Sequence, residues 1–119
     1  MENLRKHARI PITSVAHITP DGPQKSIEVF VRDISTYGLG GYMSCGYEKG
    51  DTLLVQLELS TTTGESIEAS IQGQIIWSRK LNRGKKYAFG LEFQEMKKNH
   101  PKLYLYLKEL EEILFPDTE

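Results

Sequence analysis

A carboxylate, a hydroxyl and a glycine lie close together in the stretch Asp-Ile-Ser-Thr-Tyr-Gly at residues 33–38. In an extended chain, residues two apart point to the same face, so the spacing predicts that Asp33 and Ser35 project together. Gly38 lets the backbone turn, or approach a bound molecule, without a side chain in the way. This combination suits an edge with two hydrogen-bond donors, such as the Watson–Crick edge of guanine. It is also typical of an ordinary turn, because Asp and Ser hydrogen-bond their own backbone.

A second group of polar side chains lies upstream, at residues 5–9, with the sequence Arg-Lys-His-Ala-Arg. Arg5 and Arg9 are four positions apart, so an extended or a helical backbone can direct both to one side. Two guanidinium groups suit phosphate oxygens or the O6/N7 edge of guanine. Lys6 and His7 are predicted to be secondary contacts that help to neutralise phosphate. Taken alone, such a segment is also typical of a solvated N-terminal arm.

Together the two motifs resemble the signature of the PilZ domain, in which Arg-x-x-x-Arg precedes Asp-x-Ser-x-x-Gly. The stretch that ends at Trp77 and the segment 87–93 (Tyr-Ala-Phe-Gly-Leu-Glu-Phe) resemble the same family, which comprises bacterial receptors for cyclic di-GMP. The resemblance implies a six-stranded antiparallel β-barrel with a C-terminal α-helix. It also implies that the ligand is bound by these residues: Arg5, Arg9, Asp33, Ser35 and Gly38.

The organisation that follows is an N-terminal arm (1–10) with the first motif, a barrel (11–96) and a helix (97–116). The arm has little apolar surface to offset the entropy of ordering, so we expect it to be disordered without ligand. A dianionic dinucleotide would fold the arm over the barrel, and an unidentified effector protein would bind the new surface. Leu4 is neutral, which favours one ligand per site over a stacked pair with four negative charges.

The hydrophobic pattern supports this fold. Alternation of apolar and polar residues predicts strands at 15–19, 26–33, 39–43, 52–59, 66–79 and 86–93. In the fifth of these, Trp77 has the same parity as Ile71 and Ile75, which predicts that all three share one face. From Leu103 the apolar period becomes that of an amphipathic helix, which Asn99 or His100 would cap and which is predicted to end at Pro116.

Composition restricts the function. A chain of 119 residues with a formal net charge of -1 is one domain without a global positive field, so any anion site must be local. The single cysteine, Cys45, fits a reducing cytoplasm and no internal disulfide framework. No apolar run approaches the roughly 20 residues that span a bilayer, and the start lacks the apolar core of a signal peptide. We expect a monomer or weak dimer.

Other function classes are less well supported. No catalytic set of Ser, His and Asp, no Cys–His pair, no metal-ligand spacing and no P-loop occurs, so an enzyme, a cofactor and a metal site are not predicted. One alternative is a small barrel that binds single-stranded nucleic acid with the basic residues 80–86 and with aromatic side chains. These are Tyr37, Tyr42, Trp77, Tyr87 and Phe89. The second alternative is an adaptor of the same fold that does not bind the nucleotide.

Overall fold

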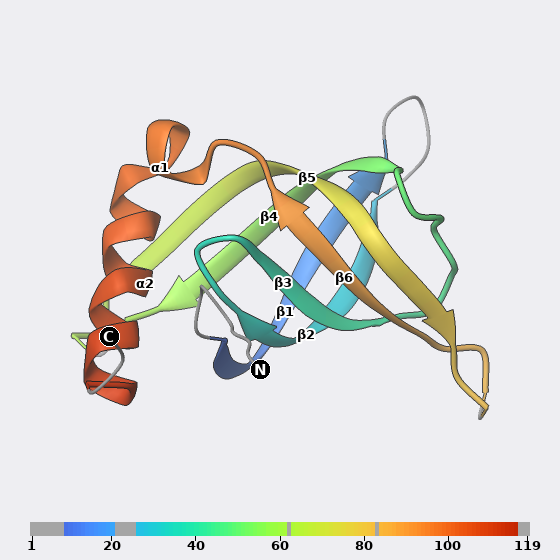
Figure 1. Ribbon diagram of the computed structural model, residues 1–119, viewed down its shortest axis with the longest axis horizontal. Coiled ribbons are helices and arrows are strands. Elements are labelled where there is room, and N and C mark those ends of the chain that lie inside the picture. Colours follow the sequence, from blue (N-terminus) through green and yellow to red (C-terminus); the bar gives the residue numbers. More distant parts are fainter. Residues whose placement is uncertain (1–8, 21–25, 62, 83, 117–119) are drawn as a thin grey trace.

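The computed structural model describes residues 9–20, 26–61, 63–82 and 84–116, without the side chain of Thr13. The strands are β1 (Ile10–Pro20), β2 (Ile27–Ile34), β3 (Gly38–Met43), β4 (Thr52–Ser60), β5 (Ser66–Lys80) and β6 (Tyr87–Phe93). They form a closed barrel in the order β1-β2-β3-β6-β5-β4, and every neighbouring pair is antiparallel. Two helices follow, α1 (Met96–Asn99) and α2 (Pro101–Leu114), at one end of the long axis (Figure 1). The predicted barrel and C-terminal helix are confirmed.

The core fills the barrel because the strands alternate as their sequences predict. In β4, Leu53 and Val55 are fully buried, while Leu54 and Gln56 are exposed on the outer face. A strand with this pattern buries one row of side chains and leaves the other row in water. A shift of register by one residue would reverse the two rows, so the pattern fixes how β4 pairs.

An irregularity in β2 decides which way the polar residues of the motif point. Val31 lies opposite Gly41, but Asp33 lies opposite Gly40, so Arg32 is an extra residue in β2. Such a β-bulge changes the parity of the strand. Strict alternation after Val31 would direct Asp33 into the core. With the bulge, Asp33 instead pairs with exposed cationic side chains on the outer surface.

A second bulge lies in β5. Ile75 is opposite Leu91 and Trp77 is opposite Gly90, so Ile76 is the extra residue. The prediction that Trp77 shares the inner face with Ile75 is therefore wrong, because the bulge shifts the parity between them. Trp77 is 37% exposed, on the outside of the barrel.

Helix α2 covers the barrel with one face. It begins at Pro101, with His100 at the N-cap position but without a hydrogen bond from that side chain. Leu103 and Leu107 are buried and belong to the core, and the helix contacts β1 and β5. No helix in the described part of the chain is long and apolar enough to cross a membrane.

Truncation of Leu107 tests whether α2 is part of the folding unit. The side chain is wholly buried, so Leu107→Ala should lower the free energy of unfolding by about 3 kcal/mol, through lost burial and a residual cavity. Leu105 lies on the same helix but is 62% exposed, so Leu105→Ala should change it by less than about 0.5 kcal/mol. Urea denaturation measures both values. Equal values for the two variants would contradict this packing.

Candidate functional site

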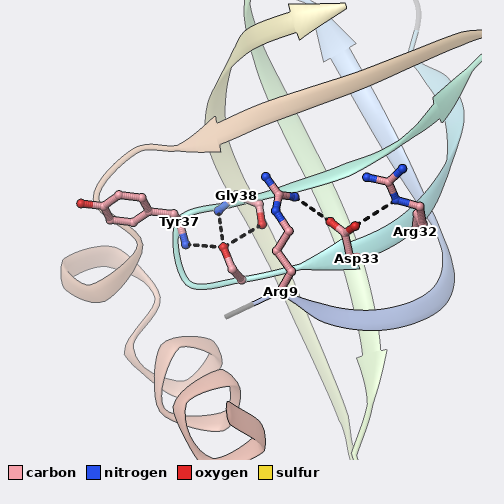
Figure 2. A network of polar contacts seen from close by, with 6 residues as sticks. Arg9, Arg32, Asp33, Tyr37 and Gly38 are labelled. Carbon is pink, nitrogen blue, oxygen red and sulfur yellow. Dashed lines mark hydrogen bonds and ion pairs between the residues drawn. The ribbon is translucent and has the colours of Figure 1, made fainter. Parts of the chain in front are cut away.

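Pairing of β1 with β2 brings the two polar motifs together. Ile10 lies opposite Ile34 and Pro11 lies opposite Asp33, so Arg9, which directly precedes β1, lies beside the end of β2. Its Nη1 donates to Oδ1 of Asp33 at 2.8 Å (Figure 2). The Arg9 side chain is 42% exposed and that of Asp33 is 13% exposed. One arginine of the first motif and the acid of the second thus form an ion pair on the barrel surface.

Arg32 binds the other oxygen of the same carboxylate. Its Nε donates to Oδ2 of Asp33 at 2.9 Å. The guanidinium carbon lies 5.9 Å from the centroid of the Tyr42 ring, in the range of a cation–π contact. The hydrogen bond to Asp33, with a further contribution from Tyr42, raises the pKa of Arg32 above its usual value. The carboxylate is therefore held from both sides by guanidinium groups.

The hydroxyl of Ser35 has a different partner. Strand β2 ends at Ile34, so Ser35 lies in the turn, where it is 6% exposed. Its Oγ accepts hydrogen bonds from the backbone N–H of Tyr37 at 3.1 Å and of Gly38 at 3.2 Å (Figure 2). The backbone N–H of Ser35 donates to the Gly38 carbonyl oxygen at 2.8 Å. The expectation that Asp33 and Ser35 project together from an extended chain is wrong, because the strand stops between them.

A row of small residues extends from the ion pair across the outer surface of the barrel. Asp33 lies opposite Gly40, Gly40 lies opposite Gly90, and Gly90 lies opposite Trp77. A Cβ atom on Gly90 would clash with the indole of Trp77, so this ring rests on the glycine. Both glycines are buried, because the Arg32 and Asp33 side chains lie over Gly40 and the Trp77 indole lies over Gly90. The two glycines therefore let the charged pair and the indole pack closely against β3 and β6.

The predicted site residues fall into three groups. Arg9 and Asp33 are brought together, although 24 positions separate them. Ser35 and Gly38 follow Asp33 in the sequence and shape the turn between β2 and β3. The other predicted residues lie outside the described part of the chain; they are Arg5, Lys6 and His7.

The sequence reasoning missed two residues at this surface, Arg32 and Trp77. Arg32 directly precedes Asp33, so the sequence did contain a signal, namely a second cationic side chain next to the acidic one. Trp77 was noted for the family resemblance and for the nucleic-acid alternative, but its parity pointed inward, and the bulge in β5 reverses this direction. Both residues reach the site because the strands pair irregularly.

The geometry weakens the alternative of a stacking surface for single-stranded nucleic acid. Of the aromatic residues considered, Phe89 is wholly buried and Tyr87 packs against the core. Bases stack on exposed rings, so Phe89 cannot serve and the half-buried Tyr87 offers only part of its ring. Among the described residues, no group of three or more His, Cys, Asp and Glu side chains is placed to hold a metal ion.

Comparison with known proteins identifies the family. The family model described as PilZ domain matches residues 3–115. The chain belongs to the PilZ domain family. The Arg9–Asp33 ion pair joins the Arg-x-x-x-Arg and Asp-x-Ser-x-x-Gly stretches of this chain. No curated protein matches the sequence significantly.

Solved structures share the PilZ fold at low identity. The PilZ domain of YcgR from Escherichia coli, solved with c-di-GMP, matches with a TM-score of 0.63 and 13% identity over 98% of this chain and 100% of that chain. The inhibitor of motility MotI/DgrA of Bacillus subtilis matches with a TM-score of 0.78 and 13% identity over 99% of this chain. The complex of MrkH from K. pneumonia with c-di-GMP matches with a TM-score of 0.65 and 11% identity over 98% of this chain. This PilZ domain spans 55% of the Bacillus protein and 54% of MrkH.

Proposed function

We propose that this PilZ domain is a receptor for cyclic di-GMP. The observation that carries the proposal is the ion pair between Arg9 and Asp33 on the outer surface of the barrel. The two motifs are far apart in sequence, and the polar pair lies where a planar base can reach it. Structural neighbours that contain c-di-GMP support the same ligand class, although their identity to this chain is low.

Guanine fits this arrangement for a specific chemical reason. The Asp33 carboxylate has about four lone-pair sites, and the two arginines each use one of them. The remaining sites can accept N1–H and N2–H of guanine as charge-assisted hydrogen bonds. The arginine of the first motif then faces phosphate or the O6/N7 edge. We assign Ser35 and Gly38 the role of shaping the turn beside the base.

The segment that precedes β1 supplies the signalling step in this proposal. Arg5 lies four positions before Arg9 and adds a second guanidinium for the dianionic ligand, with Lys6 and His7 as secondary contacts. Ligand binding would hold this segment over the barrel and create a surface that an effector protein recognises. The identity of that effector is not specified by the site.

Calorimetric titration tests the receptor function. We expect cyclic di-GMP to bind the full chain with a stoichiometry of one, and cyclic di-AMP to give no binding at the same concentration. Adenine offers no N1–H, so the carboxylate would be left without its donors. An absence of heat with cyclic di-GMP would favour a nucleotide-independent adaptor. A salt-dependent shift of short single-stranded oligonucleotides would favour the nucleic-acid alternative.

Trp77 provides an optical test, because it is the only tryptophan in the sequence. Asp33 on β2 and Trp77 on β5 lie at the same level of the outer surface, with Gly40 and Gly90 between them. A dinucleotide bound at Asp33 can therefore reach the indole, and tryptophan emission should change with the saturation curve measured by calorimetry. Trp77→Leu should weaken binding about tenfold, within the range of base–aromatic stacking. Asp33→Asn at the same ligand concentration is the control, and we expect its tryptophan emission to stay unchanged. Binding with unaltered emission would place the ligand elsewhere on the surface.

A further inference from the structure

Arg32 belongs to neither of the two signature motifs, yet it makes the same kind of contact with Asp33 as Arg9 does. Its Nε–Oδ2 distance of 2.9 Å matches the Arg9 Nη1–Oδ1 distance of 2.8 Å. It is the extra residue of the β2 bulge, which is why it and Asp33 lie on the same outer surface. Its side chain is 47% exposed, so it is accessible to a molecule bound there.

The direction of the Arg32 side chain is informative. A Cβ atom built on Gly40 would lie 3.2 Å from Nη2 of Arg32 and 3.2 Å from Oδ1 of Asp33. A donor of Arg32 and an acceptor of Asp33 therefore both lie over Gly40, close to each other on the outer surface. The guanidinium has five N–H donors, and the Nε bond to Asp33 uses one of them.

The order of these groups complements the edge of guanine. Guanine presents O6, N1–H and N2–H in a row, which is one acceptor followed by two donors. Arg32 and the two oxygens of Asp33 present one donor followed by two acceptors, the arrangement that cytosine uses. Adenine has an N6 amine in place of O6, so an N–H of adenine would face an N–H of Arg32. This arrangement costs binding energy because neither donor has an acceptor.

We propose that Arg32 is a ligand-contacting residue that donates to O6 of the guanine whose N1–H and N2–H bind Asp33, an inference that rests on the proposed receptor function. Arg32 and Asp33 then act as one recognition unit formed by adjacent residues on the bulge. The unit selects guanine, while the arginines of the first motif neutralise phosphate.

Tyr42 positions this unit. The Arg32 guanidinium lies over the Tyr42 ring, and that ring stacks with Phe30 at a centroid distance of 6.4 Å and an interplanar angle of 28°. Tyr42 and Phe30 are directly opposite each other on β3 and β2. A guanidinium held against a ring on paired strands loses less conformational freedom on binding than a free one.

Substitutions of Arg32 test the proposal by calorimetry with cyclic di-GMP. Arg32→Ala should weaken binding roughly tenfold to one hundredfold, the range for a hydrogen bond to a charged group. Arg32→Lys keeps the charge but lacks the planar fork, so it should stay within about threefold of Arg32→Ala. Tyr42→Leu should weaken binding about threefold, because Arg32 loses its support. Wild-type affinity in Arg32→Lys would overturn the proposal in favour of charge alone.

An inosine analogue of cyclic di-GMP separates the two members of the unit. This ligand keeps O6 and N1–H but lacks the exocyclic amine. The loss caused by Arg32→Ala should be equal with both ligands, whereas the loss caused by Asp33→Asn should be smaller with the analogue. A loss in Arg32→Ala that differs between the ligands would overturn the O6 contact. A loss that vanishes at high salt would overturn it in favour of a phosphate contact.

Thermal unfolding without ligand distinguishes binding from a structural role of Arg32. Lower stability with unchanged affinity in Arg32→Ala would overturn the proposal, since Arg32 would then only support the bulge. The receptor function itself fails only if the wild-type chain does not bind cyclic di-GMP. Wild-type binding that is indifferent to Arg32 would remove this inference and leave the receptor function intact.

Discussion

Replacement of Asp33 by asparagine is expected to lower the affinity for cyclic di-GMP at least about one hundredfold. The carboxylate accepts two charge-assisted hydrogen bonds in the proposed complex, and loss of two such bonds corresponds to about 3 kcal/mol or more. The amide of asparagine also directs an N–H group at a donor of guanine, which is repulsive. Isothermal titration calorimetry on the full chain measures the change.

This loss should not arise from unfolding. The two arginines that bind Asp33 are 42% and 47% exposed, so solvent screens these ion pairs and each contributes less than about 1 kcal/mol to stability. Glu28→Gln is a matched control, since it converts an exposed carboxylate on the same strand to an amide away from Arg9. We expect it to bind like the wild type. Equal affinity in wild type, Asp33→Asn and Arg9→Ala would remove the site assignment.

Gly38→Ala should have the largest effect on stability among the site variants. A Cβ atom at this position would overlap the carbonyl oxygen of Leu91, a backbone atom of the paired strand β6. The strands must separate there, and the Ser35–Gly38 hydrogen bonds of the turn must distort. We expect the free energy of unfolding to fall by about 3 kcal/mol, at the upper end for overpacking. For a domain of marginal stability this is a large fraction of the total.

Gly40→Ala is the informative comparison for that variant. A Cβ atom at Gly40 would meet the ends of two flexible side chains, Arg32 and Asp33, at 3.2 Å, so these can move aside. Stability should therefore change by less than about 1 kcal/mol. The added methyl group would displace Arg32 and Asp33 from their present positions, so ligand affinity should fall. Urea denaturation should show a large loss of stability in Gly38→Ala and a small one in Gly40→Ala, and calorimetry should show that Gly40→Ala binds the ligand more weakly. A stable Gly38→Ala variant would contradict the close approach of β3 and β6.

The local pattern of the sequence predicted the six strands and helix α2, but not the short helix α1 or the start of β1 at Ile10. Alternation in β4 placed Leu53 and Val55 inside the barrel, because a strand has a period of two and water excludes apolar side chains. The change of period after residue 100 gave the helix whose face buries Leu103. The two polar motifs and the resemblance that they carry predicted that Arg9 and Asp33 lie together, and the two side chains form an ion pair.

The predictions failed where strand pairing is irregular. A bulge depends on which distant strand lies opposite, and neither strand encodes this by itself. The bulge at Ile76 turns Trp77 outward, against the prediction that it shares a face with Ile75. The bulge at Arg32, which was not predicted, turns Asp33 outward. Strand β2 also ends at Ile34, so Ser35 does not project beside Asp33. Its hydroxyl oxygen instead accepts hydrogen bonds from backbone N–H groups of the turn that follows.

The sequence by itself therefore determined the strands, the helix and the chemical groups of the site. Tertiary structure decided which of these groups meet. It placed Arg32 beside Asp33 over Gly40, and it placed the Trp77 indole over Gly90 on the same outer surface. The physical reason is that side-chain types and periods are local properties, whereas the register between strands and the direction of a residue beside a bulge arise only when segments far apart in the chain pair.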